Sequence, residues 1–227
     1  MNKEPRRTIV AVFAHPDDET FGPSGTLYKL AQENDVYVIC ATSGEAGENH
    51  RTRKSKRTIA QIRRDELRRS AKILGIKRAY FLGFEDGTLS NNLYHQIAEK
   101  VEKKLKVLKP DTLITFEPKG ISGHIDHIAI AMITTFVFRK LSFVTTLMYH
   151  ATLKERAATR HDYFIYFPPG YDRSEFDEIV NISDVWEVKV AAMREHKSQI
   201  KDMQNILENS KNFPKEEYFF VLKKEDL

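Results

Sequence analysis

The first residues that could do chemistry are His15, Asp17 and Asp18, which follow directly on an apolar run of β-forming residues at 8–14. Runs of this length, rich in Val, Ile and Phe, are typical of fully buried strands in a parallel sheet. In open α/β sheets, ligands bind at the carboxyl ends of such strands. An imidazole and two carboxylates at that place indicate a functional site rather than packing.

A second group, His-Ile-Asp-His at residues 124–127, comes after another strand-like run at 112–116. Because the carboxyl ends of parallel strands lie at one edge of a sheet, we expect both groups at the same edge. Catalytic zinc commonly takes three ligands from His and Asp or Glu and leaves a position for water. His15 and Asp18 could converge on one ion, and His127 could complete the set.

Strands and helices must alternate to bring these groups together, and the sequence shows that alternation. Apolar runs of strand length are separated by helical patterns, with the runs at residues 8–14, 36–41, 79–82 and 112–116 and the helices at 20–32, 58–74 and 93–108. This order favours right-handed βαβ units and a parallel sheet. We therefore predict an α/β fold, a Rossmann-like three-layer sandwich with a mostly parallel central sheet.

The second half of the chain is predicted to continue the same domain. We expect a helix near 124–141, strands near 143–150, 163–167 and 178–182, a long final helix from Ser183 or Asp184 to about 207, and a last edge strand or packing segment at 218–222. No internal repeat or low-complexity tract marks a linker, so residues 1–227 are interpreted as one domain.

Composition narrows the class of protein. A hydrophobic content of 41% with 30% charged residues is ordinary for a globular protein. No apolar run approaches the roughly 18–20 residues that span a bilayer, so a cytoplasmic location is the default expectation. The single cysteine, Cys40, excludes an internal disulfide framework and a cysteine-rich zinc site. Its apolar neighbours predict a buried strand position.

Positive charge is concentrated between Arg51 and Arg78, where twelve Lys or Arg residues face two acidic ones. A solvated loop and an exposed helix face are the simpler interpretation, and an anionic partner is the alternative. No aromatic residues interleave there, which argues against nucleic-acid binding. We expect the basic insert at about 48–57 to form a lid near the site.

Taken together, these motifs resemble the PIG-L/LmbE-like family of zinc-dependent N-acetylsugar de-N-acetylases. The resemblance runs from about residue 8 to 200 and rests on Ala14-His15-Pro16-Asp17-Asp18-Glu19, Gly25-Thr26, Thr42-Ser43-Gly44-Glu45-Ala46-Gly47, Arg63-Arg64-Asp65-Glu66, Phe81-Leu82-Gly83-Phe84-Glu85-Asp86-Gly87, Gly123-His124-Ile125-Asp126-His127 and His196-Lys197-Ser198-Gln199. The chain departs from the family at Ile125, where many members have proline, and at Ser122, where some have a tyrosine near the substrate carbonyl.

The resemblance implies one zinc ion per chain, held by His15, Asp18 and His127. Bound zinc lowers the pKa of water to about 7 and polarises a carbonyl. The implied reaction is hydrolysis of the acetamide of an N-acetylglucosaminyl-type small molecule to acetate and an amino sugar. A homo-oligomer is possible, and the particular sugar is left open.

Three residues are expected to carry the catalytic steps. Asp17 would act as general base, and its alternative role is to cap the following helix. His124 would stabilise the oxyanion as a cation and protonate the leaving amine. Asp126 would orient His124 and raise its pKa, or support a metal-bound histidine.

The substrate is expected to contact Arg63, Asp86 and Glu45. Arg63 could instead form a salt bridge with Glu66 one helical turn later, and Asp86 could belong only to a turn. His196 could serve packing, assembly or catalysis.

Two functions compete with the deacetylase. A metal-dependent phosphoesterase would use the basic stretch and two metal ions about 3.5–4 Å apart. A non-catalytic carbohydrate or nucleic-acid binding module would need neither Asp17 nor His124 to hold zinc.

Overall fold

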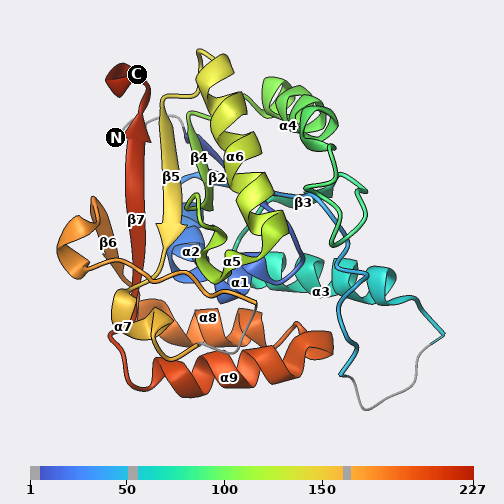
Figure 1. Ribbon diagram of the computed structural model, residues 1–227, viewed down its shortest axis with the longest axis vertical. Coiled ribbons are helices and arrows are strands. Elements are labelled where there is room, and N and C mark those ends of the chain that lie inside the picture. The colour runs from blue at the N-terminus through green and yellow to red at the C-terminus, as the bar shows by residue number, and fades with distance from the viewer. Residues whose placement is uncertain (1–5, 51–55, 161–164) are drawn as a thin grey trace.

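The computed structural model describes residues 6–50, 56–160 and 165–227. Within these residues, seven strands form one sheet in the order β3-β2-β1-β4-β5-β7-β6 (Figure 1). Five of them are parallel: β1 (Thr8–Phe13), β2 (Asp35–Cys40), β3 (Arg78–Phe81), β4 (Thr112–Phe116) and β5 (Thr146–Ala151). The strand order reverses at β1 and β4, which opens a crevice at their carboxyl ends.

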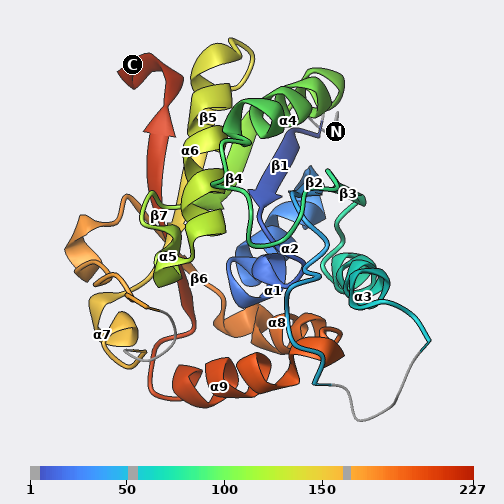
Figure 2. The ribbon, with the colours of Figure 1, turned by 45° about the vertical axis from the view of Figure 1, so that its right-hand side comes forward.

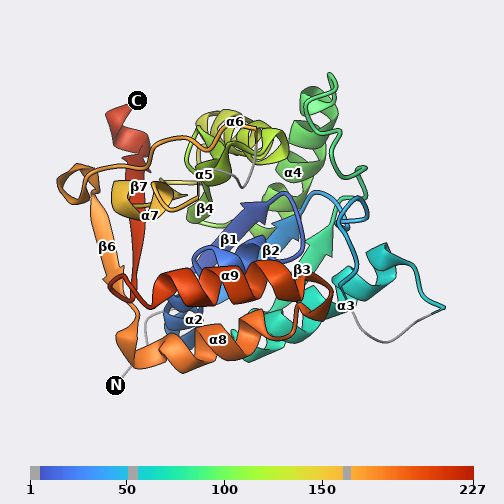
Figure 3. The ribbon, with the colours of Figure 1, turned by 60° about the horizontal axis from the view of Figure 1, so that its bottom comes forward.

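Helices cover both faces of the sheet, as Figures 2 and 3 show. One face carries α2 (Ser24–Glu33), α3 (Ile59–Ile73) and α8 (Trp186–Met193), with α9 (Ile200–Ser210) beyond α8. The other face carries α4 (Tyr94–Leu108) and α6 (Ile125–Lys140). Single turns follow three strands: α1 (Asp18–Phe21), α5 (Gly120–Gly123) and α7 (Lys154–Ala157). The predicted three-layer α/β fold is confirmed.

Burial on both faces explains the apolar composition of the central strands. Within β1, every residue from Val10 to Phe13 is completely buried, as a strand between two helical layers requires. Cys40 at the end of β2 is also completely buried, which confirms its predicted strand position.

Gly75 follows the end of α3, next to the end predicted for the helix at 58–74. It has a φ of +71°, which glycine adopts without steric cost. Its N–H donates to the carbonyl of Lys72 at 3.3 Å, and the N–H of Ile76 donates to the carbonyl of Ala71 at 2.9 Å. This pair of bonds is a Schellman motif and satisfies the last carbonyls of the helix.

Two predicted helices are each divided in the structure. The helix expected at 20–32 is split into α1 and α2, because Gly22 and Pro23 interrupt it and proline has no N–H to continue the ladder. The long final helix was wrong: α8 ends at Met193, and α9 begins at Ile200. Between them His196, with a ψ of 61°, leaves helical geometry and turns inward.

The C-terminal strands also differ from the prediction. β7 (Glu216–Lys223) lies inside the sheet, antiparallel to both β5 and the true edge strand β6 (Glu178–Asn181). Residues 165–167 of the predicted strand at 163–167 are not a strand, and 163–164 lie outside the described residues. Half of the predicted lid at 48–57, residues 51–55, lies outside them as well.

Candidate metal centre and active site

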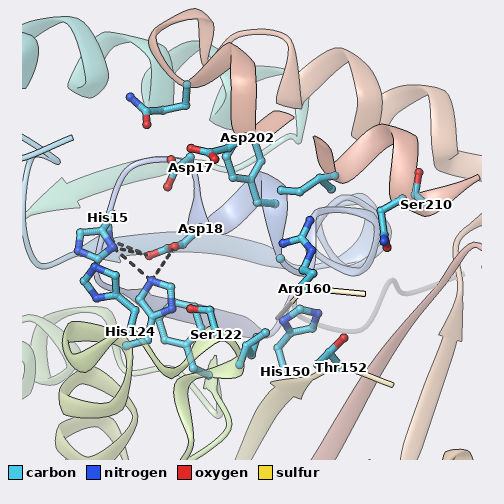
Figure 4. Close-up of a pocket in the computed structure, with 18 of the residues that line it drawn as sticks. His15, Asp17, Asp18, Ser122, His124, His150, Thr152, Arg160, Asp202 and Ser210 are labelled. Carbon is cyan, nitrogen blue, oxygen red and sulfur yellow. Dashed lines mark hydrogen bonds and ion pairs between the residues drawn. The ribbon is translucent and has the colours of Figure 1, made fainter. Parts of the chain in front are cut away.

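A cavity of about 540 Å³ lies at the carboxyl ends of the parallel strands (Figure 4). Seven of the predicted site residues line it: His15, Asp17, Asp18, Arg63, Asp86, His124 and His127. Asp126 and Glu45 do not line it. The two loops that follow β1 and β4 therefore meet at one sheet edge, as the sequence analysis expected.

His15, Asp18 and His127 converge on one point. The Nδ1 atom of His15 lies 3.2 Å from Nε2 of His127 and 3.7 Å from a carboxylate oxygen of Asp18. The other carboxylate oxygen of Asp18 lies 3.2 Å from Nε2 of His127. Two imidazole nitrogens and a carboxylate at such distances form a donor set suited to a transition-metal ion.

The ring of His127 is held so that Nε2 faces the other two residues. Its Nδ1 lies 3.1 Å from the carbonyl oxygen of Gly120, which can only accept a hydrogen bond. In a neutral ring Nδ1 therefore carries the proton, and Nε2 has a lone pair that can bind a metal. The ring stacks on Phe116 at a centroid distance of 4.1 Å and an angle of 6°.

The opposite nitrogen of His15 faces two carboxylates. Its Nε2 lies 2.9 Å from Asp86 and 3.3 Å from Asp126. The Asp126 carboxylate also accepts the N–H groups of Gly87 at 2.8 Å and Leu89 at 3.1 Å. Metal-binding histidines commonly donate their second N–H to a carboxylate in this way, which fixes the ring and raises its basicity.

Electrostatics show that this cluster favours positive charge. Burial opposes protonation of His15, but Asp126 and Asp86 outweigh it and raise the pKa of His15 to about 10. The pKa of Asp18 is lowered despite its burial, chiefly by His127 and His15. A buried site that stabilises a proton so strongly is also suited to a divalent cation, so the residues present fit a metal ion.

Two other groupings of side chains could share in a metal site. His15, His124 and His127 each bring a ring nitrogen within 4.8 Å of the others, and His15, Asp86 and Asp126 meet the same limit. The second grouping lies around Nε2 of His15, and its two carboxylates, Asp86 and Asp126, also accept hydrogen bonds from backbone N–H groups.

Asp17 is paired with Arg63 inside the protein. The guanidinium of Arg63 donates to the Asp17 carboxylate at 2.8 Å and to the carbonyls of Pro16 at 2.7 Å and Gly44 at 2.8 Å. The expected alternatives did not form: Arg63 does not pair with Glu66, and the Asp17 side chain makes no helix-cap hydrogen bond. Burial raises the pKa of Asp17 to about 6 against the opposing charge of Arg63.

His124 is not oriented by the Asp126 carboxylate, which faces His15 instead. The backbone N–H of Asp126 donates to Nδ1 of His124 at 3.2 Å, which leaves the proton of a neutral ring on Nε2. Burial, followed by His15 and His127, lowers the pKa of His124 to about 4. The expected rise in the pKa of His124 was therefore wrong. Asp126 instead contacts His15, which matches its alternative predicted role as a partner of a metal-binding histidine.

Glu45 and Asp86 brace the loops around the site. The Glu45 carboxylate accepts the N–H of Ser43 at 3.0 Å and of Asp86 at 3.3 Å. Asp86, in addition to its contact with His15, accepts the N–H of Ala46 at 3.1 Å. Both acids therefore join the loop after β2 to the loop after β3.

Behind Asp17 lies a buried network that the sequence did not predict. Asp17 has a φ of +128°, a strained value for a residue other than glycine. Its N–H donates to Oε2 of Glu19 at 3.0 Å. The other oxygen of Glu19 contacts Ser70 Oγ at 2.5 Å and Nε2 of His196 at 2.7 Å. Glu19 and His196 are both fully buried, and they hold the backbone at Asp17.

The His196→Ala variant should be much less stable than the parent protein. Removing one partner leaves the Glu19 carboxylate buried without its cation, which costs about 3–5 kcal/mol of unfolding free energy. Denaturant unfolding followed by circular dichroism measures this. The exposed His95→Ala variant is the control and should unfold like the parent. Equal stability of the two variants would contradict the buried ion pair.

Several cavity residues were not found from the sequence. His150 lines the cavity with a buried, unpartnered Nδ1. Arg156, Arg160 and Lys189 also line it. No motif marks these residues, although His150 lies near the end of β5 beside Phe116 of β4, at the same sheet edge as the metal centre. Ser122, which stands where some relatives have tyrosine, lines it too.

Comparison with known proteins gives consistent matches. The PIG-L family model, GlcNAc-PI de-N-acetylase, matches residues 10–138. The probable N-acetyl-alpha-D-glucosaminyl L-malate deacetylase 2 of Bacillus cereus is 30% identical over 87% of this chain and 86% of its own. The 1D-myo-inositol 2-acetamido-2-deoxy-alpha-D-glucopyranoside deacetylase of Mycobacteroides abscessus is 28% identical over 86% of this chain and 82% of its own.

A solved structure shares the fold. The N,N'-diacetylchitobiose deacetylase of Pyrococcus horikoshii superimposes with a TM-score of 0.70 at 22% identity, covering 96% of this chain and 85% of that one. None of the helices in the described ranges is long and apolar enough to cross a membrane.

Proposed function

The chain belongs to the PIG-L family, and from that premise we propose that it is a zinc-dependent deacetylase that releases acetate from an N-acetylglucosaminyl compound and leaves an amino sugar. The main support for this proposal is that relatives named as deacetylases of such compounds match most of the chain. Those relatives differ in the group attached to the sugar, malate in one and inositol in the other. We treat residues 1–227 as one catalytic domain, since one sheet joins strands from both halves of the chain.

In this proposal His15, Asp18 and His127 hold one zinc ion. This set is supported by the short distances between their facing atoms and by the outer partners that aim both rings. When bound, zinc supplies Lewis-acid polarisation of the acetamide carbonyl and a water of lowered pKa.

Asp17 acts as the general base. Its carboxylate lies beside Asp18 in the chain and is held by Arg63, so it can accept a proton from water as the oxygen attacks the carbonyl carbon. A pKa near 6 suits a base that works near neutral pH. Arg63 therefore serves to position the base, and any contact of its own with substrate would be additional.

His124 stabilises the oxyanion as a neutral donor. Its Nδ1 accepts a backbone N–H, so Nε2 carries the proton that would be donated to the negative oxygen of the tetrahedral intermediate. A neutral ring has no spare proton for the leaving amine. The proton that Asp17 takes from water then passes to the amine nitrogen as the C–N bond breaks, and the products are acetate and the free amino sugar.

A screen for acetate release tests the proposal and the need for metal. Purified protein should deacetylate at least one member of a panel of N-acetylglucosaminides. Dialysis against a chelator should remove that activity, and zinc should restore it, because the proposed ligands converge on a metal ion. Phosphate release from matched phosphate esters is measured in parallel. Phosphate release without acetate release, together with two metal ions per chain, would favour the phosphoesterase.

A further inference from the structure

The cavity continues past the metal centre to a second end that the proposed mechanism does not use. Residues of α7, the end of α9 and the start of β7 form this end, with Arg156, Arg160, Asn209, Ser210, Pro214 and Glu216 in its wall. Figure 4 shows the side chain of Arg160 directed into the space between Asp18 and Ser210. A substrate whose acetamide reaches the histidines would therefore extend toward two arginines.

Arg156 is a partly buried cation whose donors are incompletely used. Its Nη2 donates to the carbonyl oxygen of Pro214 at 3.3 Å, and its guanidinium carbon lies 5.4 Å from the ring centroid of Phe213. Its Nε is buried and has no hydrogen-bond partner. A guanidinium offers five N–H donors, and leaving a buried donor unpaired is unfavourable. The Nε–H group of Arg156 can therefore donate a hydrogen bond to a bound ligand.

The nearby carboxylates are engaged by other cations. Glu216 pairs with Arg173 at 3.1 Å, and Glu217 pairs with Lys189 at 2.7 Å. Among residues 6–50, 56–160 and 165–227, no carboxylate forms an ion pair with Arg156. Within these ranges, no carboxylate therefore neutralises this guanidinium through an ion pair of its own.

Arg156 and Arg160 stand four residues apart and act on each other. Burial lowers the pKa of Arg156, and the positive charge of Arg160 lowers it further, against the opposing effects of Tyr218, Glu217 and Glu216. An anion at this end would reduce that repulsion and would satisfy the unpartnered Nε–H of Arg156. Guanidinium groups bind carboxylate and phosphate oxygens through paired, charge-assisted hydrogen bonds.

We propose that Arg156 and Arg160 form an oxyanion subsite for the aglycone, the group attached to the anomeric carbon of the sugar. The substrate is then an N-acetylglucosaminide whose aglycone carries a carboxylate or a phosphate. This inference rests on the proposed deacetylase function and specifies its substrate class. Arg156 selects the substrate and takes no part in the bond-breaking step.

Acetate-release kinetics of the metal-loaded enzyme on three substrates test the subsite: a methyl glycoside, a glycoside of a hydroxy acid and a sugar 1-phosphate. The parent should prefer one of the two charged substrates. Arg156→Gln should raise KM for that substrate about 10- to 100-fold, the usual scale of a lost charged hydrogen bond, with kcat unchanged. KM for the methyl glycoside should stay within about 3-fold, because that substrate has no oxyanion for the arginine to bind.

Two further variants make the result specific. Arg156→Lys keeps the charge but loses the paired donors, so its KM should fall between those of the parent and Arg156→Gln. Lys154→Gln removes an exposed charge from the same helical turn and should behave like the parent on all three substrates. The charged substrate that responds to Arg156→Gln identifies the oxyanion as carboxylate or phosphate.

The possible failures are distinguishable. Equal KM changes on charged and neutral substrates, or no change at all, would overturn the subsite while leaving the deacetylase intact. Acetate release from none of the substrates would overturn the proposed function. In that case, calorimetric titration with the corresponding amino-sugar products tests the subsite alone. Binding of a charged product that Arg156→Gln abolishes supports it, and binding unaffected by the substitution, or none, rejects it.

Discussion

The Asp17→Asn variant should release acetate about 10²- to 10⁴-fold more slowly than the parent, because an amide cannot take the proton from water. KM should change little, since the side chain keeps its size and its place beside Arg63. The loss should appear in kcat and in kcat/KM alike, as expected for an interaction made only in the transition state.

Metal analysis separates this effect from loss of the ion. Asp17→Asn should retain the metal content of the parent, because the proposed ligands flank residue 17 and do not include it. Asp65→Asn, a change at a half-buried acid on α3 that pairs with Arg57 and Arg68 away from the cavity, should keep full activity. A full-rate Asp17→Asn enzyme would require another base, and a variant without metal would make Asp17 a ligand.

The His127→Ala variant should lose both the metal and the activity. It removes the Nε2 atom that faces His15 and Asp18 at 3.2 Å. Removal of an outer partner typically costs about 10–100-fold in metal affinity or activity, and removal of a direct ligand should exceed that. Zinc content after dialysis and acetate release at fixed free zinc are the two measurements.

His124→Ala and His95→Ala are the matched controls for that result. His124 reaches the same cluster but is not one of the proposed ligands, so its loss should leave the metal in place and reduce only the rate. His95 is exposed, and its loss should change neither. Retention of one equivalent of metal by His127→Ala would move the site to another grouping of these side chains.

The parallel half of the fold was predictable because its signals are local. β1, β2 and β4 are short apolar runs buried between helices that carry their own 3.6-residue pattern, and β3 is a short, half-buried strand at the sheet edge. The end of α3 could be placed from Gly75 alone, since its positive φ satisfies the helix carbonyls there. The convergence of His15 with His127 then follows from strand order.

The C-terminal part could not be predicted in this way because distant contacts decide it. Sequence periodicity carries one helix through His196, yet the pair with Glu19, 177 residues away, draws that histidine inward and breaks the helix. The position of β7 between β5 and β6 likewise depends on pairing across the chain. Arg156 meets Pro214, close to the start of β7, only through that arrangement.

The local electrostatics of the site were only partly predictable. Asp126 was expected to serve either His124 or a metal-bound histidine, and the positions of Gly87 and Leu89 decide between these roles. Arg63 was predicted on α3 beside Glu66, but the backbone turn at Asp17 brings a different carboxylate within 2.8 Å. The spacing of residues along a helix does not identify the ion-pair partner of a side chain when a loop that follows another strand brings a second carboxylate close to it.

The separation of His15 and His127 by 112 residues has a consequence for how the protein persists in a cell. An unfolded chain does not hold these side chains together, so the metal binds the native state alone. Ligand linkage then adds about 2.7 kcal/mol of stability when free metal is 100 times its dissociation constant. The supply of metal ions would thus govern both turnover and the amount of enzyme that escapes proteolysis, and starvation for the ion would deplete the protein itself.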